Sequence, residues 1–328
     1  MLVMVAVLAM MLAACGDDGG DVRDLGSDGT SSGSASGSAS GSGSVSTSGS
    51  ASGSATGLAE EDLEGETDDP LVLSAVDGYK SYVVDQIDQL IADTTVFTDA
   101  VRAGDLEAAQ AAYAPSRVSW ERIEPIAGLI EEIDGAVDAR VDDFAGTDDP
   151  AFTGWHRLEY LLFEQQVTEG GVALADGLDE NLQTLKTGMA DLELPPAAVA
   201  IGAAELIEEV SEGKITGEED RYSKTDLWDF AANVEGAERI IELLSPALEA
   251  TDPGLLEDVD TGFAELNETL SPFRDGDGWV LYCQEDDPYP SPRCPDTTVT
   301  AATIDLLKAQ LAGLSENISM VAGALGLQ

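Results

Sequence analysis

The residues best suited to chemistry in this 328-residue chain are its only histidine, His156, and the glutamate three positions later, Glu159. Residues three apart share one face of a helix, so the imidazole and the carboxylate could bind one cation. The neighbouring Trp155, Leu158 and Leu161 follow the apolar spacing of a buried helix. The same spacing is typical of a buried histidine beside a salt-bridged glutamate, and spacing alone leaves both readings open.

A third candidate ligand, the acidic residue Glu124, lies one helical turn from Trp120 and is predicted to face inward with it, whereas Glu121 is predicted to point elsewhere. A buried carboxylate is costly unless it is paired or coordinates a cation. Arg122 or Arg157 could supply a purely structural partner. The following connection offers further candidate ligands, any one of which could reach the site: Asp134, Asp138, Asp142 and Asp143.

The chain is strongly acidic, with 64 Asp and Glu against 15 Lys and Arg and a formal net charge of -49. Such a surface repels phosphate backbones, so no nucleic-acid partner is expected, and cations are its natural ligands. Because the charge is spread along the chain, it also fits a simple need for solubility or a salty, extracytoplasmic setting.

The N-terminus predicts export. Residues 1–14 form an apolar run too short to span a bilayer, and the run ends at Cys15 in a pattern that resembles a bacterial lipobox. We therefore expect a lipoprotein signal peptide over residues 1–14 and lipidation of Cys15. No Lys or Arg precedes the run, which leaves an upstream start codon open. An N-terminal membrane helix is the alternative.

Residues 15–69 are predicted to form a disordered linker, because their Ser, Gly and Ala-rich composition cannot bury enough apolar area to order the chain. A coil of about 50 such residues has a root-mean-square reach of roughly 40 Å. The folded part is thus expected at the cell membrane, lipid-anchored on its extracytoplasmic face, in the periplasm or cell-wall space.

Two cysteines remain, Cys283 and Cys294, on either side of a proline-rich acidic loop. In an exported protein they predict a disulfide that closes this loop. A two-cysteine metal site is the weaker alternative, because no further thiol or histidine could complete it.

Residues 70–328 predict an all-α fold of two packed antiparallel helical bundles of the four-helix type. Apolar residues recur every three or four positions from 71 to 103 and predict a helix that Gly104 ends. Asp105 is predicted to cap a second helical stretch, and Pro115 is predicted to open a third. Strand patterns are too short to seed a sheet. Further helices are predicted at about 152–167, 173–191, 197–212, 226–249, 253–270 and 300–326.

Several segments together resemble the imelysin family. The segments ERIEP (121–125), VDARVDD (137–143), TGWHRLEY (153–160) and KITGEEDRYS (214–223) occur in the order found in that family. The continuation TDLWDFAANVEGA (225–237) is most similar to the EfeO-type branch, and the resemblance extends over roughly residues 71–328. For the block from 214 to 237, helix capping and interhelix packing are the expected roles.

The resemblance implies a function in metal uptake. EfeO-type proteins are extracytoplasmic metal-binding components of a bacterial iron-uptake system that also has a membrane permease and a dye-decolorising haem peroxidase. We therefore expect an iron-binding lipoprotein that delivers iron to a membrane permease, with that permease and peroxidase as partners. The longer EfeO proteins carry an N-terminal cupredoxin domain, which is not expected here because the Ser/Gly tract stands in its place.

The resemblance also implies a ligand set. The family's His-x-x-Glu motif falls on His156 and Glu159, its Arg-Ile-Glu-Pro glutamate matches Glu124, and its aspartate aligns with Asp138. Such a hard, anionic site suits iron, as Fe2+ or Fe3+, or manganese; zinc or copper are alternatives, and the imidazole disfavours calcium. Repulsion among the carboxylates is expected to raise their pKa values, and metal affinity is expected to fall as the pH drops.

An enzyme is the main alternative, because imelysins were first described as metallopeptidases. An inverted zincin motif needs a histidine directly after the glutamate, but Tyr160 stands there and the chain has no second histidine. The sequence therefore predicts a binding protein without catalytic residues. Cation-dependent binding of an envelope polysaccharide is the third possibility.

Overall fold

The computed structural model describes residues 67–327. The predicted signal peptide, Cys15 and the linker up to residue 66 lie outside these residues. Each helix in the described part of the chain is too short or too polar to span a lipid bilayer. The α-helices are α1 (Pro70–Ala103), α2 (Leu106–Glu121), α3 (Glu131–Val137), α4 (Gly154–Glu159), α5 (Val172–Gly188), α6 (Pro196–Glu212), α7 (Asp226–Thr251), α8 (Pro253–Leu270), α9 (Ala301–Ser319) and α10 (Val321–Ala324).

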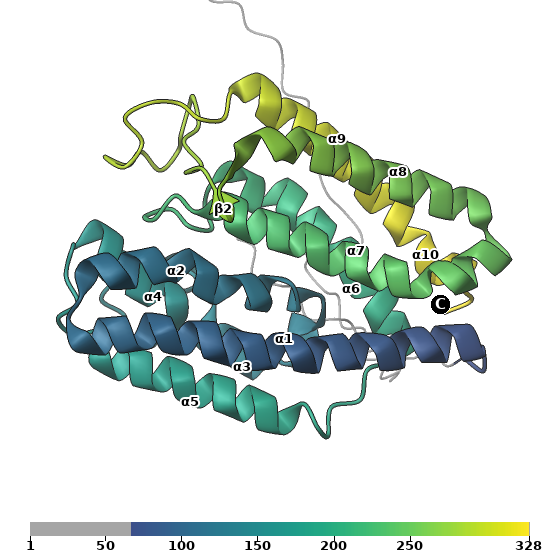
Figure 1. Ribbon diagram of the computed structural model, residues 1–328, viewed down its shortest axis with the longest axis horizontal. Coiled ribbons are helices and arrows are strands. Elements are labelled where there is room, and N and C mark those ends of the chain that lie inside the picture. The colour runs from purple at the N-terminus through teal and green to yellow at the C-terminus, as the bar shows by residue number, and fades with distance from the viewer. Residues whose placement is uncertain (1–66, 328) are drawn as a thin grey trace, which may run out of the picture. The chain divides into compact units, whose positions relative to one another are not determined.

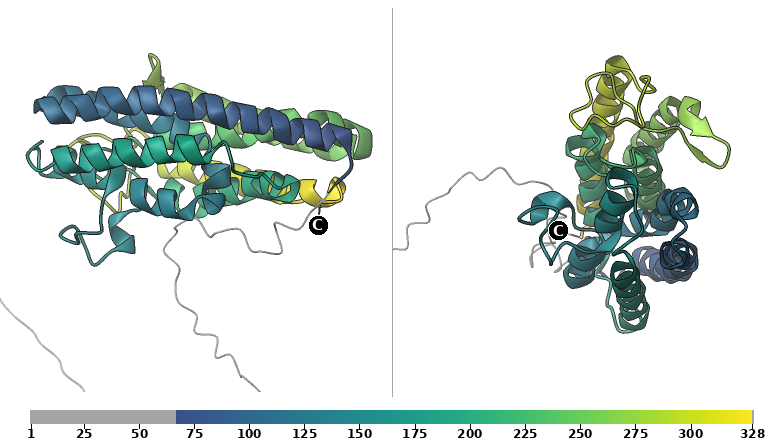
Figure 2. Two further views of the ribbon diagram at one scale, coloured as in Figure 1. Left: turned by 90° about the horizontal axis from the view of Figure 1, so that it is seen from below. Right: turned by 90° about the vertical axis from the view of Figure 1, so that its left-hand side faces the viewer.

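The helices form two packed bundles, as predicted. In Figure 1, α1, α2 and α5 lie together on one side, with the short helices α3 and α4 beside them, while α6, α7, α8 and α9 form the other bundle. Helix α7 joins the two because it contacts both α1 and α2 as well as α6 and α8. Figure 2 shows α1 and α5 running side by side, and in its second view most helices are seen nearly end-on.

Helix α1 shows how the sequence sets an element and its boundaries. The Asp69 carboxylate accepts a hydrogen bond from the Leu71 amide at the start, and Gly104 ends the helix in the left-handed conformation at φ 73°. One face meets the core at three- and four-residue spacing. Its buried residues include Val72, Tyr79, Val83, Ile87, Leu90, Phe97 and Val101.

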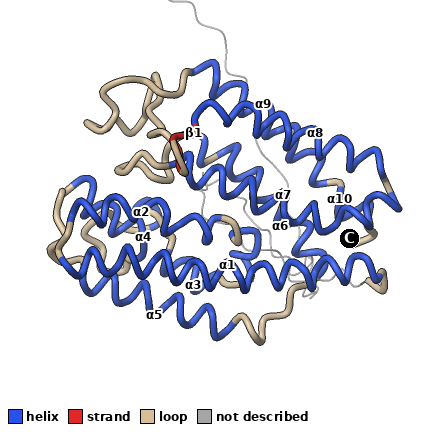
Figure 3. The backbone as a smooth tube through the Cα atoms, in the orientation of Figure 1, coloured by secondary structure: helices blue, strands red, loops and turns tan. Residues whose placement is uncertain are grey.

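The structure corrects three local predictions. Pro115 does not open a helix but lies inside α2, where packing against α1 and α7 compensates for the hydrogen bond that proline cannot donate to Ala111. The pattern from 300 to 326 breaks at Met320 into α9 and α10. A two-residue antiparallel ribbon, β1 (Arg274–Asp275) with β2 (Gly278–Trp279), is also present and is drawn in red in Figure 3.

The long connection between α8 and α9 contains the predicted disulfide. Cys283 and Cys294 are bonded, with their Cα atoms 5.3 Å apart. This confirms the pairing. The closed loop packs against the segment that precedes α7, through contacts that matter for the site below.

Candidate metal centre

Helix α4 carries His156 and Glu159, and a glycine sets its position. Gly154 has φ 74°, and a Cβ atom there would lie 2.0 Å from the carbonyl oxygen of Val137. Only glycine permits this close approach of the start of α4 to the end of α3. The approach places the histidine beside Asp138, which directly follows α3.

After Glu159 the helix widens into a π-helical turn at Tyr160–Glu164. Such turns are rare and are frequent at functional sites. The turn is largely buried through Leu161, Leu162 and Phe163, so the widening is fixed by packing.

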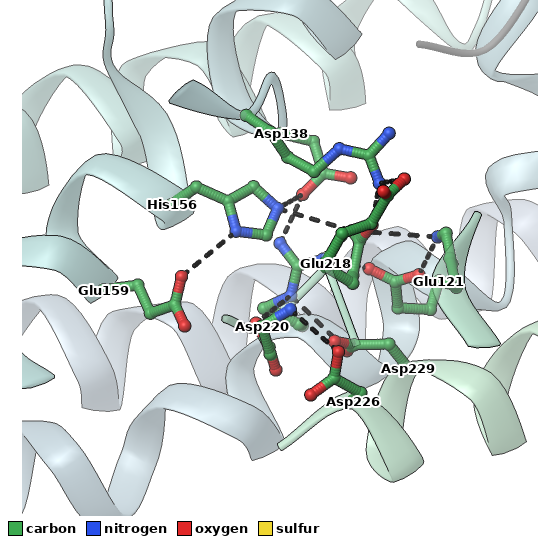
Figure 4. A network of polar contacts seen from close by, with 12 residues as sticks. Glu121, Asp138, His156, Glu159, Glu218, Asp220, Asp226 and Asp229 are labelled. Carbon is green, nitrogen blue, oxygen red and sulfur yellow. Dashed lines mark hydrogen bonds and ion pairs between the residues drawn. The ribbon is translucent and has the colours of Figure 1, made fainter. Parts of the chain in front are cut away.

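His156 lies among three carboxylates and is almost fully buried, with 2% of its surface exposed. Its Nε2 atom is 3.5 Å from Asp138 Oδ1 and 3.4 Å from Glu219 Oε1, while its Nδ1 atom is 3.5 Å from Glu159 Oε2 (Figure 4). Neither ring nitrogen has a hydrogen-bond partner of good geometry, and neither does Glu159 Oε2. Buried polar atoms are usually hydrogen-bonded, so these three atoms are candidate ligands for a cation.

The other oxygen of Glu159 is firmly held. Its Oε1 atom accepts hydrogen bonds from the backbone amides of Tyr222, at 2.9 Å, and Ser223, at 2.7 Å. Two backbone donors on one oxygen leave the second oxygen directed at the imidazole. The carboxylate is thereby oriented before any cation arrives.

On the opposite side of the ring, Asp138 is also fixed by donors. Trp120 Nε1 donates to Asp138 Oδ2 at 2.9 Å, and a guanidinium nitrogen of Arg117 donates to Asp138 Oδ1. Arg117 also donates to Glu219 Oε1 at 3.0 Å. The two carboxylates facing Nε2 therefore already share a buried positive charge.

Arg117 lies at the centre of a wider acidic network, several carboxylates of which are labelled in Figure 4. Its side chain is fully buried and forms ion pairs with carboxylates from several elements. A buried guanidinium requires such compensation. The carboxylate partners are Glu121, Asp138, Glu219, Asp220 and Asp229.

Glu124 occupies a neighbouring position in the same network. Lys214 Nζ donates to both of its carboxylate oxygens at 2.7 and 2.9 Å, and also to Glu121 Oε2 at 2.8 Å. Asn233 contacts the oxygens of both glutamates. Glu124 is buried as predicted, but Glu121 does not point elsewhere: helix α2 ends at Glu121, so the next segment brings both glutamates onto one lysine.

The pKa values follow from these contacts. Burial and the Arg117 charge act to lower the pKa of His156, but the three surrounding carboxylates outweigh them and raise it well above its usual value. Burial acts to raise the pKa of Asp138 and of Glu219, yet their cationic neighbours outweigh it and hold both pKa values below the usual range. Burial is the main cause of the raised pKa of Glu159.

The prediction that repulsion raises the carboxylate pKa values was therefore wrong for Asp138. It overlooked the cations, because Arg117 gave no local sequence signal that it is buried. The metal-free centre is best described as an imidazolium held between ionised acids.

An acidic pocket of about 310 Å³ lies beside the two carboxylates that face Nε2. Asp138 and Glu219 form part of its wall, so the carboxylates that flank the imidazole also meet solvent-accessible space. Burial raises the pKa of Asp134 in this pocket to about 7. The remaining lining residues include Glu124, Glu131, Asp143, Glu209 and Arg140.

Two groups of side chains in the described part of the chain could hold a metal ion. One joins Asp138, His156 and Glu219, and the other joins His156, Glu159 and Asp220; in each, the ligand atoms lie within 4.8 Å of one another. Nitrogen and oxygen ligands at these separations suit a transition metal bound at about 2.0–2.2 Å. The donor atoms therefore fit a cation on either side of the ring.

Comparison with known proteins shows the family of the chain. The chain matches the family model described as Imelysin, which is named for the M75 peptidases, over residues 75–318. The chain belongs to the imelysin family. It is 44% identical over 254 residues to proteins named iron uptake system component EfeO from Escherichia coli O157:H7, Escherichia coli K12 and Shigella flexneri. The alignment covers 77% of this chain but only 64% of each relative.

In this imelysin, the structure brings some of the predicted ligands together. Asp138, His156 and Glu159 meet, whereas the Glu124 carboxylate contacts Lys214 and Asn233. Neither suggested arginine pairs with Glu124, since Arg122 pairs with Glu235 and Arg157 lies over aromatic rings. That Glu124 binds metal stays a prediction, and it would require Lys214 to release an oxygen.

The alternative aspartates lie elsewhere. Asp142 pairs with Arg221, and Asp143 accepts a hydrogen bond from the backbone amide of Arg140. Among the four aspartates of this connection, only Asp138 is within 3.5 Å of the imidazole. The geometry thus favours Asp138.

Sequence reasoning missed Glu219, Asp220 and Lys214. All three belong to the block from 214 to 223 that contributed to the family resemblance but was assigned to capping and packing. A signal was available: a run of charged residues, Glu218 to Arg221, lies a few residues before α7, a helix in which most residues are buried.

Proposed function

We propose that this imelysin captures iron outside the cytoplasmic membrane and delivers it to a membrane permease of an iron-uptake system. The observation that carries the proposal is the buried centre at His156, which acidic side chains surround. Both imidazole nitrogens and one oxygen of Glu159 lack hydrogen-bond partners there. The names of the aligned relatives, which are iron uptake system components, support the choice of iron as the cargo.

We place the cation between His156 Nδ1 and Glu159 Oε2, with Asp220 as the third side-chain ligand. These first two atoms are 3.5 Å apart and have no hydrogen-bond partner elsewhere, so a cation between them would replace the imidazolium proton on Nδ1 and no hydrogen bond from another residue. Asp220 accepts its hydrogen bonds from the uncharged hydroxyls of Tyr113 and Thr225. On the Nε2 side, by contrast, the Arg117 guanidinium already donates to both carboxylates. Asp138 and Glu219 then orient the ring through its other nitrogen, as acidic side chains commonly do for a metal-bound histidine.

The acidic pocket supports capture of a cation from solution. A concave surface lined mostly by carboxylates concentrates cations near it, and this one extends to the acids beside the imidazole. Lipidation of Cys15 would keep the binding domain close to the permease, and a haem peroxidase of the same system is the further partner we propose.

Hydrolysis of peptides is the function that the family model's name suggests, but the centre lacks a feature that the zincin mechanism requires. His156 is the only histidine, so a metal here would have carboxylates as its other protein ligands. We therefore propose a binding protein. A fluorescent casein assay with added zinc should show no cleavage above that of His156→Ala.

Uptake of radiolabelled iron by cells tests the proposal. Cells that express the chain with its permease should accumulate iron faster than cells that express His156→Ala at the same level, because the variant lacks the imidazole ligand. Arg239→Gln, on the exposed part of α7, is the matched control and should transport normally. Equal uptake with wild type and His156→Ala would refute a role of this centre in delivery.

A further inference from the structure

The segment Lys214–Thr225 supplies much of the centre although it is mostly irregular. It contributes the side chains of Glu219 and Asp220 and the two amides, of Tyr222 and Ser223, that hold Glu159. Only residues 214–216 form a helical turn before α7 begins at Asp226. An irregular segment needs contacts from elsewhere if it is to hold ligands accurately.

Those contacts come from the disulfide-closed connection between α8 and α9, residues 279–299, which we call the clamp. At the start of the segment, the Tyr282 hydroxyl donates to the Ile215 carbonyl and the Gln284 amide donates to the Thr216 carbonyl, both at 2.8 Å. At its end, the Tyr282 backbone amide donates to the Lys224 carbonyl at 2.8 Å. The clamp therefore holds both ends of the segment.

The contact nearest to Glu159 is made by Arg293. Its Nε atom donates to the Ser223 carbonyl at 3.0 Å, and its guanidinium lies 4.7 Å from the centre of the Phe163 ring in the π-helical turn. Arg293 thus links Ser223, whose amide holds Glu159, to the π-helical turn that follows Glu159. Cys294 is adjacent to it in sequence, so the disulfide fixes the position of this arginine.

Lys224 shows that the segment is held in a conformation it would not adopt alone. It is not a glycine, yet it has φ 62°, in the left-handed region. Its ammonium is fully buried and pairs with Asp287 of the clamp, 2.8 Å away. Such backbone conformations persist only where surrounding contacts impose them.

We propose that the clamp positions Glu159 and Asp220 for the cation, with Arg293 as a positioning residue that acts through Ser223 without touching the metal. This inference rests on the proposed iron site. It gives the disulfide a role in positioning the metal ligands, in addition to its effect on the stability of the fold.

Iron titration of the purified full chain tests the clamp. Arg293→Met keeps the disulfide but has no donor for the Ser223 carbonyl, and it should lower iron affinity by about 10- to 100-fold, the loss typical for a residue that orients a metal ligand. Arg293→Lys retains a donor for the Ser223 carbonyl and should recover part of the affinity. Arg239→Gln removes an equal charge from α7, away from the clamp, and should bind as wild type does.

The visible spectrum of bound Co2+ provides a readout that stability alone would not move, because it reports the ligand geometry. Arg293→Met should change this spectrum while its helical circular dichroism stays unchanged, and the double variant Cys283→Ser/Cys294→Ser should change it in the same direction. Wild-type affinity and spectrum in Arg293→Met would overturn the clamp. If wild type and His156→Ala bind iron equally, the iron site itself fails instead.

Discussion

At the scale of residues, the centre is defined by where positive charge already lies. Arg117 holds the two acids on the Nε2 side, and the raised pKa of His156 favours a protonated ring when no metal is bound. Glu159 differs from these acids, because its Oε2 atom is buried and accepts no hydrogen bond. A cation that binds there replaces a proton and leaves the fixed ion pairs in place.

The first prediction concerns pH. Only the deprotonated imidazole binds metal, and the pKa of His156 in the metal-free chain is raised well above 6.5. Below that raised pKa, affinity for ferrous iron should fall by about tenfold per pH unit, because one proton must be displaced for each metal bound. Anaerobic titrations between pH 5.5 and 7.5 should also detect release of that proton. A constant affinity over this range would show that the imidazole is not a ligand.

The second prediction identifies which ring nitrogen binds. Asp220→Asn removes a proposed ligand, whereas Glu219→Gln removes an acid that orients the ring through Nε2. Each variant loses one negative charge with little change in size. Iron affinity should fall by about 10- to 100-fold in Glu219→Gln and further in Asp220→Asn. The reverse order, measured by titration, would place the cation on the Nε2 side.

At the scale of elements, the position of α4 depends on the contact between Gly154 and the backbone of Val137. The contact brings the end of α3 and the start of α4 together, so two candidate ligands from different elements meet. The segment 214–225, which lies between α6 and α7, and the clamp, which lies between α8 and α9, complete the centre.

The third prediction follows from that contact. Gly154→Ala combines a left-handed φ with a Cβ atom 2.0 Å from a backbone oxygen, so α4 must shift. We expect a loss of about 1–3 kcal/mol in the free energy of unfolding, together with weaker iron binding. Gly177→Ala on α5 is the control: no atom lies within 4 Å of the added Cβ, so stability should stay equal or rise.

Urea unfolding and iron titration of both variants measure these effects. A stable Gly154→Ala variant with wild-type iron affinity would mean that the α3–α4 contact does not position His156.

Elements with strong periodicity were predictable from sequence, and those set by tertiary contacts were not. The boundaries of α1 follow from Asp69 and Gly104, both of which act locally. Pro115 was misread because packing outweighs a local helix-breaking tendency. The π-helical turn after Glu159 has no sequence signature, since it is imposed by how its buried residues pack.

At the scale of the whole molecule, the charged centre lies where several elements converge. Its acids come from α2, α4 and α7 and from the segments that follow α3 and precede α7. His156 and Glu159 could be predicted because they share one helix. The charged run could have marked Glu219 as a candidate, but that Glu219 and Lys214 meet this centre could not be predicted, because about 60 residues separate them from His156 in sequence and only the fold brings them together.

The same reasoning applies to Glu124. Sequence identified it as inward-facing, which is correct, but an inward-facing acid can meet a cationic side chain as readily as a metal. Its buried partner, Lys214, lies 90 residues away in the chain.

The central claim is that one cation binds at His156 and Glu159, and metal analysis with iron titration tests it most directly. The purified full chain should bind about one iron per chain, and His156→Ala and Glu159→Ala should each lose most of that affinity, because each removes a ligand atom. Glu235→Ala, whose carboxylate pairs with Arg122 away from the ring, should bind as wild type does. Unchanged affinity in both His156→Ala and Glu159→Ala would contradict the assignment of the site.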